Sequence, residues 1–306
     1  MLLGMTVGHD GSASVGLGEA GAGRGAHRFS HAAMATVFEV HCVHADARYA
    51  AQSAQGAFDL VDRLEQDLSR FVENSDISRI NHLAGGATTR VSPGTMKCLQ
   101  IAWHVHGLTG GAFDASIGSG LEHLELDPDE FTVRARAEGA RLDLGGIGKG
   151  YAVDRMAEVL EDWEVLHALV HGGYSSVLAL EAPPDQNGWP LTLSAPGPGD
   201  NRVLARVSAR QRAFSASGVR KGDHILDPRT GLAVLGRRAA WVAVPREDEG
   251  AAAVADALST AFMIQPAGEI AELCRRFPGL EAWIVPEPAE GAEEAPVLVH
   301  LGDPAA

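Results

Sequence analysis

Hydrophobic residues recur along the chain with two different periods, which predicts a mixture of helices and strands. Apolar residues three and four positions apart between Ala54 and Leu68 predict an amphipathic helix over about 47–69. Ser92-Pro93 is typical of a helix start and Gly110-Gly111 of a helix end, so a second helix is predicted between them. The same spacing predicts helices over about 148–163, 249–264 and 268–276.

Short runs of β-branched and aromatic residues between turn signals predict strands. They cover residues 34–43, 131–136, 140–144, 166–170, 176–181, 190–195, 203–208, 241–244, 282–285 and 297–301. Strands grouped with strands favour an α+β fold with an antiparallel sheet over a doubly wound α/β sheet. Residues 1–28 are rich in Gly, Ala and Ser without periodicity, so we expect a flexible lead-in followed by a single domain over 29–306.

Composition narrows the function classes. Apolar residues make up 45% and charged residues 21%, as in globular proteins, and the net charge is −15. An acidic chain argues against nucleic-acid binding, although one metal ion or glycine loop could still hold a small polyanion such as a nucleotide. The three cysteines are far apart, which predicts buried free thiols. With no long apolar run and no convincing signal peptide, we expect no transmembrane segment and a cytoplasmic location.

Residues 142–154, LDLGGIGKGYAVD, join a predicted strand to a helix through a glycine turn with a lysine. Such a turn places backbone N–H groups and the positive end of a helix at one point, which suits a phosphate. Lys149 is followed by Gly150 instead of Ser or Thr, which excludes a P-loop, and the glycine spacing excludes the dinucleotide fingerprint. A glycine turn that only lets the helix pack on the sheet remains the alternative.

Two further segments carry candidate chemistry. In residues 223–231, DHILDPRTG, the turn residues come with His224, Asp227 and Arg229. Histidine is the usual general base near neutral pH and arginine the usual phosphate clamp, although a plain turn would also explain the Pro and Gly. Asp256 and Thr260 lie one helical turn apart, so a carboxylate and a hydroxyl share a face and could hold Mg²⁺ or Ca²⁺.

In order along the chain, these segments resemble the FAD:protein FMN transferases, the ApbE-like family. The resemblance also rests on Met34-Ala35-Thr36, on Ser69-Arg70-Phe71 with the serines that follow, and on Phe113-Asp114. It runs from Met34 to about Ile264 and implies an ApbE-like, T-fold-related α+β domain. In that fold, mixed and antiparallel sheets are flanked by helices, and the active site lies in the cleft between them.

The resemblance implies an Mg²⁺-dependent enzyme that transfers FMN from FAD to a Thr or Ser hydroxyl of an acceptor flavoprotein and releases AMP. The implied metal ligands are Asp256, Thr260 and the Gly148 carbonyl, and the implied catalytic residues are His224 as the base, Asp227 and Arg229. The implied contacts to FAD are Met34, Phe71, Asp114, Gly146, Lys149, Tyr151 and Asp154.

Some positions depart from the family pattern. Tyr174 follows Gly172-Gly173 where the family usually has Asp, and Ala216 stands in Ser215-Ala216-Ser217-Gly218 where the family has Thr. Two alternative functions therefore stay open: FAD hydrolysis to FMN and AMP, with water as the acceptor, and flavin binding without turnover.

Overall fold

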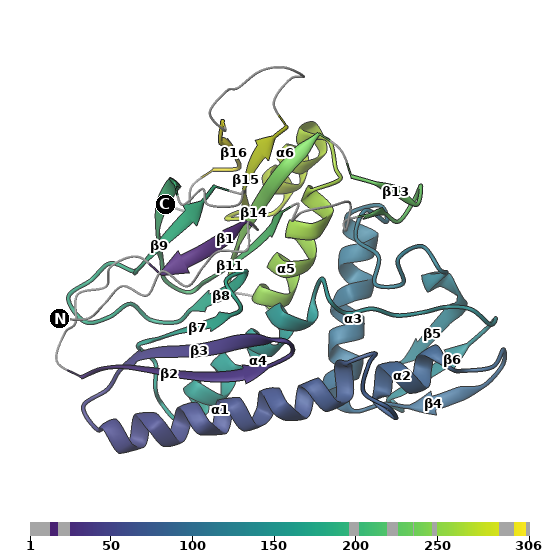
Figure 1. Ribbon diagram of the computed structural model, residues 1–306, viewed down its shortest axis with the longest axis horizontal. Helices are drawn as coiled ribbons and strands as arrows, with labels where there is room; N and C mark the ends of the chain where they lie inside the picture. The colour runs from purple at the N-terminus through teal and green to yellow at the C-terminus, as the bar shows by residue number, and fades with distance from the viewer. Residues whose placement is uncertain are drawn as a thin grey trace.

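The structure, a computed structural model, describes residues 13–17, 25–195, 202–218, 226–234, 236–246, 250–287 and 297–303. Its centre is an eight-stranded antiparallel sheet (Figure 1), with the strand order β16-β15-β14-β11-β8-β7-β3-β2. In chain order these strands are β2 (Ala26–Ala33), β3 (Thr36–Val43), β7 (Ala168–Gly172), β8 (Ser176–Ala179), β11 (Arg212–Gly218), β14 (Arg237–Pro245), β15 (Glu281–Pro286) and β16 (Val299–Leu301). The predicted α+β class with an antiparallel sheet is confirmed.

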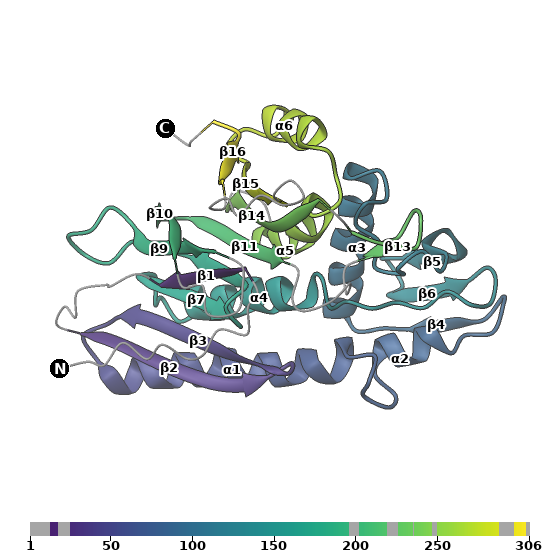
Figure 2. The ribbon, with the colours of Figure 1, turned by 45° about the horizontal axis from the view of Figure 1, so that its top comes forward.

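Helices cover one face of this sheet, and a smaller sheet covers the other. The helices are α1 (Ala47–Leu68), α4 (Gly148–Asp162) and α5 (Ala251–Phe262), with α3 (Pro93–Leu108) and α6 (Ala267–Arg276) beside them. The three-stranded sheet on the opposite face is ordered β1 (Ser14–Leu17), β9 (Trp189–Ser194) and β10 (Val203–Ala209), as Figure 2 shows. Successive residues of the central strands therefore enter two different cores: Trp241 packs under the small sheet and Val242 under the helices.

A third group of elements lies beside the end of α1 (Figure 1). It comprises α2 (Asp76–Asn81), the one-turn 3-10 helix Leu121–His123, and a sheet of β4 (Thr88–Arg90), β6 (Thr132–Ala135) and β5 (Leu124–Asp127). The hairpin of β12 (Leu226–Asp227) and β13 (Leu232–Ala233) lies close to it. Ser75 caps α2 and Ser92 caps α3 through side-chain bonds to backbone N–H groups, and the sequence indicated the start of α3.

Two predictions from the sequence need correction. The lead-in was expected to lack structure over 1–28, but β1 and the first residues of β2 lie within it, and Val15 is fully buried. Residues 140–144 were expected to form a strand, yet they pair with no strand in the part of the chain that the structure describes. The Asn81 side chain instead bonds both the N–H and the carbonyl of Leu142, at 2.6 and 2.9 Å. An amide thus satisfies the backbone groups that a neighbouring strand would have bonded.

Candidate active site

The candidate site is built where the N-terminus of α4 meets the middle of α5. Asp256, which is 3% exposed, accepts a hydrogen bond from the Gly150 N–H at 3.0 Å and another from the Ser215 hydroxyl at 3.0 Å. A β-carbon at Gly150 would lie only 2.2 Å from the Ala252 carbonyl oxygen. Glycine at this position therefore lets the two helices approach closely enough for the carboxylate to reach the helix end.

This arrangement differs from the glycine turn predicted from the sequence, in which free N–H groups would bind a phosphate. The Gly148 N–H donates to the Leu144 carbonyl at 2.7 Å, and the Gly150 N–H is used by Asp256. The Asp256 carboxylate therefore interacts with the positive end of this helix. The Lys149 ammonium lies 3.7 Å from Asp256 Oδ2 and donates to the Gly145 carbonyl at 3.2 Å. A buried anion and a partly exposed cation are thus held side by side.

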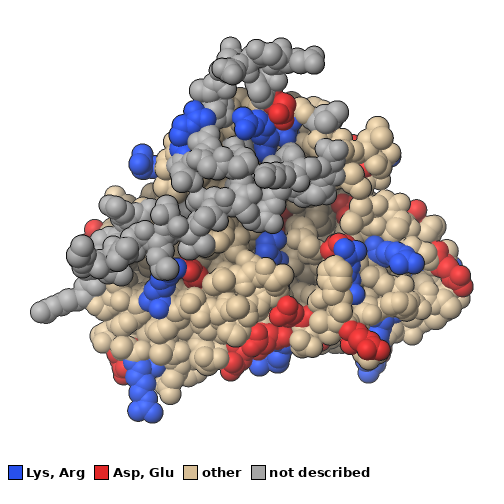
Figure 3. Space-filling view, viewed as in Figure 1, with Lys and Arg blue, Asp and Glu red and all other residues tan. Residues whose placement is uncertain are grey.

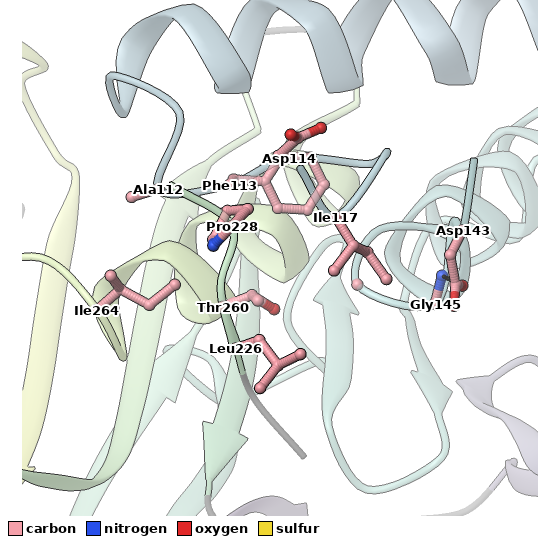
Figure 4. A pocket seen from close by; sticks show the side chains of 11 residues that line it. Ala112, Phe113, Asp114, Ile117, Asp143, Gly145, Leu226, Pro228, Thr260 and Ile264 are labelled. Carbon is pink, nitrogen blue, oxygen red and sulfur yellow. Dashed lines mark hydrogen bonds between the residues drawn. The ribbon is translucent and has the colours of Figure 1, made fainter. Parts of the chain in front are cut away.

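Two cavities adjoin these residues, and Asp143 and Gly145 line both of them. The first, which we call the lysine cavity, has a volume of about 420 Å³ and is lined by Met34, Arg70, Phe71, Gly148 and Lys149, among others. The second, the threonine cavity, has a volume of about 310 Å³. Figure 4 shows Phe113, Ile117, Leu226 and Ile264 around the threonine cavity, with the Thr260 side chain between them.

The lysine cavity carries cations and an exposed ring in an otherwise acidic protein. Phe71 is 83% exposed, and the Arg70 guanidinium lies 4.6 Å from its ring centre. The same guanidinium pairs with Asp143 at 3.2 Å. Met34 lies at the tight turn between β2 and β3, where it and Ala35 have φ values of 49° and 55°. Hairpin geometry therefore places the methionine at the edge of the cavity.

Asp114 and Gly146 lie at the threonine cavity. The carboxylate of Asp114 accepts bonds from the N–H groups of Ser116 and Gly118, at 2.7 and 3.0 Å. Much of its hydrogen-bonding capacity therefore goes to closing its own loop. A β-carbon at Gly146 would lie 3.4 Å from Thr260 Oγ1 and 3.3 Å from the Phe113 ring. Glycine at this position therefore leaves room for the Thr260 hydroxyl and the Phe113 ring beside the backbone.

Tyr151 and Asp154 do not line either cavity, which corrects their expected role as FAD contacts. Tyr151 is 2% exposed and packs in the helical core. Asp154 accepts the N–H groups of Ala252 and Ala253, at 2.9 and 2.8 Å, and so caps α5. Burial raises the pKa of Asp154 to about 7, although both backbone bonds oppose that rise. These two side chains build the junction between α4 and α5.

The predicted catalytic residues are only partly described. His224 lies outside the described residues. Arg229 pairs with Asp227 through both carboxylate oxygens at 2.9 Å, and this hydrogen bonding lowers the pKa of Asp227. The turn packs against the loop that follows α3: a β-carbon at Gly118 would lie 2.5 Å from the Pro228 carbonyl oxygen. The structure therefore places Pro228 at the threonine cavity and ties Asp227 and Arg229 to each other within the turn.

The donor chemistry fits a hard cation. Within the described parts of the chain, no group of three or more His, Cys, Asp or Glu side chains could hold a metal ion. The predicted set is of another kind, because it combines one carboxylate, one hydroxyl and a main-chain carbonyl, all of them oxygen donors. Asp256 is a buried anion with one lysine nearby, and Thr260 follows it by one helical turn. These residues fit Mg²⁺ by chemistry and by position on α5.

The structure also shows where the two residues that depart from the family pattern, Ala216 and Tyr174, lie. Ala216 points into the core under the small sheet, away from α5, so the missing hydroxyl does not face the site. Ser215 and Ser217 lie on the other face of β11 and contact α5. Tyr174 lies in the β7–β8 turn, where its carbonyl accepts the Val15 N–H at 2.8 Å. Sequence reasoning missed Arg70, Asp143 and Ser215 as site residues, although alternate serines in a strand were a visible signal.

Comparison with known proteins identifies the family of this chain. The sequence model described as the ApbE family matches residues 34–122 and 119–284, which is most of the chain. The chain belongs to the ApbE family. The FAD:protein FMN transferase of Treponema pallidum is 27% identical over 279 residues, which cover 74% of this chain and 75% of that protein. The FAD:protein FMN transferase of Salmonella typhimurium is 23% identical over 299 residues, which cover 84% of this chain and 83% of that protein.

Solved structures of ApbE proteins share the fold. The flavin transferase ApbE of Vibrio cholerae superposes with a TM-score of 0.76 at 19% identity, covering 90% of this chain and 97% of that one. The apo flavinyl transferase ApbE of Pseudomonas stutzeri gives a TM-score of 0.75 at 23% identity, covering 90% and 94%. The predicted family and the ApbE-like fold are therefore confirmed. The described part of this ApbE protein contains no helix long and apolar enough to cross a membrane, and the cytoplasmic location stays a prediction.

Proposed function

We propose that this ApbE-family protein is an Mg²⁺-dependent flavin transferase that moves FMN from FAD to a Thr or Ser hydroxyl of an acceptor flavoprotein. The observation that carries the proposal is the meeting of Lys149, Asp256 and Thr260 beside two cavities that share a wall. Its curated relatives are named FAD:protein FMN transferases, which supports the enzyme class.

The reaction is a phosphoryl transfer. The acceptor hydroxyl forms a bond to the phosphorus of the FMN half of FAD, the pyrophosphate bond breaks, and AMP leaves. His224 is proposed to take the proton of the hydroxyl, as the resemblance implies. Such a base typically contributes about 10²–10⁴-fold to the rate.

The cation would be held by the Asp256 carboxylate, the Thr260 hydroxyl and the Gly148 carbonyl. When bound, Mg²⁺ neutralises charge on the pyrophosphate and withdraws electron density from the phosphorus. Lys149 supplies a second positive charge from the lysine cavity, which matters in a protein of net charge −15. On the face shown in Figure 3, blue and red side chains are interspersed, so the charge for a dinucleotide has to come from local groups.

Other predicted residues are proposed to shape the FAD site. Phe71 and Met34 offer an exposed ring and a thioether at the lysine cavity, suited to an aromatic ring system. Gly146 and Asp114 lie at the threonine cavity. Asp227 and Arg229 are proposed to act through the shape of their turn, since each already holds the other.

The test is incubation with FAD, Mg²⁺ and candidate acceptor proteins, followed by mass spectrometry of the acceptor and chromatography of the nucleotides. Transfer predicts one added FMN mass on the acceptor and an equal amount of AMP. Free FMN with AMP would instead identify the protein as a pyrophosphatase. Tight FAD binding without any AMP would identify it as a non-catalytic flavin-binding member.

His224→Ala separates the roles of base and cofactor contact. The variant should lose about 10²–10⁴-fold in transfer rate, while its FAD affinity stays within a few-fold of the parent. A loss of FAD affinity equal to the loss of rate would show that the imidazole holds the cofactor, and the base would have to be sought elsewhere.

A further inference from the structure

Strand β11 presents two hydroxyl groups to the two predicted metal donors of α5. Alternate residues of a strand point to the same face, so Ser215 and Ser217 both face the helix, and Ala216 between them lies in the opposite core. Two residues along a strand span about 6.8 Å, and four residues along a helix span about 6 Å. The serine pair of β11 therefore matches the spacing of Asp256 and Thr260.

Ser215 holds the carboxylate. Its side chain is completely buried and donates to Asp256 Oδ1 at 3.0 Å. The other oxygen, Oδ2, accepts the Gly150 N–H at 3.0 Å. With one donor fixed on each oxygen, the carboxylate plane cannot turn about its last bond without losing a buried hydrogen bond. The remaining lone pairs of both oxygens then keep a fixed direction.

Ser217 and Ser259 restrict where the proton of Thr260 can point. Ser259 Oγ donates to the Asp256 carbonyl at 2.9 Å, which uses the only proton of that hydroxyl. In the contact of Ser217 with Ser259, also at 2.9 Å, Ser217 must then be the donor. Its proton being used, Ser217 can only accept from Thr260, whose oxygen is 3.3 Å away.

Thr260 can therefore act only as a donor in this network, and it has one proton to give. Its proton goes either to Ser217 or to the Asp256 carbonyl, which is also 3.3 Å away. In both cases no hydroxyl of the network donates to Thr260, and its oxygen lone pairs are left for a ligand. A hydroxyl prepared in this way is suited to bind a cation, because a metal ion binds lone pairs.

We propose that Ser215 and Ser217 are positioning residues for the cation: Ser215 fixes the carboxylate of Asp256, and Ser217 with Ser259 turns the Thr260 proton away from the metal. The proposal rests on the proposed function, since it concerns the same metal donors. Partners that orient metal ligands typically change metal affinity about 10–100-fold when they are removed.

The test is Mn²⁺ binding to the protein without FAD, measured by electron paramagnetic resonance of the free ion. Ser215→Ala and Ser217→Ala should each weaken Mn²⁺ binding about tenfold or more, while Ser217→Thr, which keeps the hydroxyl, should stay within about twofold of the parent. Ser176→Ala is the matched control. Ser176 lies directly opposite Ser215 on β8, is completely buried, and its hydroxyl has no hydrogen-bond partner among the described residues.

Asp256→Ala separates the two claims. If Asp256→Ala abolishes binding but Ser215→Ala and Ser217→Ala bind Mn²⁺ like the parent, the positioning roles are wrong and the metal site stands. If Asp256→Ala itself binds Mn²⁺ like the parent, both the metal site and the positioning roles are wrong. Thermal unfolding of each variant without metal shows whether a loss of binding comes from misfolding.

Discussion

At the scale of a residue, Phe71 is a side chain whose contribution to FAD binding can be measured apart from its contribution to stability. Its ring is 83% exposed at the rim of the lysine cavity and lies against the Arg70 guanidinium. An apolar ring left in water contributes little to the core, so replacing Phe71 can change binding at the cavity with little change in stability. Phe277 offers the same chemistry elsewhere, with the Arg276 guanidinium 5.6 Å from its ring centre.

We predict that Phe71→Ala weakens FAD binding several-fold, since ring stacking contributes about 0.5–1.5 kcal/mol. Its stability should stay within about 0.5 kcal/mol of the parent, as for most surface substitutions. Titration of FAD by fluorescence and unfolding in urea measure the two quantities. Phe277→Ala should leave FAD affinity unchanged, and equal losses in both variants would contradict a specific role for Phe71.

Single residues also show what could be predicted from the sequence. Asp256 and Thr260 were singled out by their spacing, because residues four apart on a helix share a face, and the family resemblance implied that they are metal ligands. Tyr151 and Asp154 lie in the same motif as Lys149 but point into the core, and a motif match does not say which way a side chain faces. Ser215 was missed because it is 41 residues from its partner, Asp256, a contact that only the folded sheet makes.

At the scale of elements, the crossing of α4 and α5 sets the geometry of the site. Gly150 lets the helices touch, Asp154 of α4 caps the start of α5, and Asp256 of α5 bonds the start of α4. Each helix thus supplies a carboxylate to the other's N-terminus, which is favourable for both helix dipoles. The sequence predicted both helices but not their contact, since no local pattern fixes a helix crossing.

Gly150→Ala should destabilise the protein by about 1–3 kcal/mol or more, because the added methyl overlaps the Ala252 carbonyl and forces the helices apart. Gly107→Ala is the control. Gly107 lies in α3, where no atom of the described ranges comes within 4 Å of an added β-carbon, so alanine there should raise stability by up to about 1 kcal/mol. Urea unfolding measures both, and a Gly150→Ala protein as stable as the parent would contradict the close crossing.

The Asp154 cap should make stability depend on pH. Its pKa is raised from 3.8 to about 7 by burial, so the folded protein holds this proton more tightly than the unfolded chain. The resulting stabilisation is complete below about pH 4 and is lost as the pH rises through about 7. The parent should therefore lose stability relative to Asp154→Asn between these limits. Urea unfolding of both proteins near pH 5 and near pH 8 measures it, and an unchanged difference would contradict the raised pKa.

At the scale of the whole molecule, the fold gathers segments that are far apart in the chain. Residues near 70, 114, 145, 228 and 260 meet at the two cavities although they span most of the sequence. The sequence predicted that these segments meet only because their order along the chain resembles that of the ApbE family. Strands β1 and β2 were missed because their residues carry no clear alternation, and pairing with β9 and β3 makes them strands.

The central claim is that Asp256 and its neighbours bind a cation that serves the cleavage of FAD. The most direct measurement is AMP formation from FAD, with Mg²⁺ and with a chelator, by the parent and by Asp256→Asn. The parent should form AMP only when the metal is present. Loss of the ligand should remove several kcal/mol of transition-state stabilisation, which is a rate loss on the order of 100-fold or more. AMP formation that continues with the chelator, or at the parental rate in Asp256→Asn, would contradict the account.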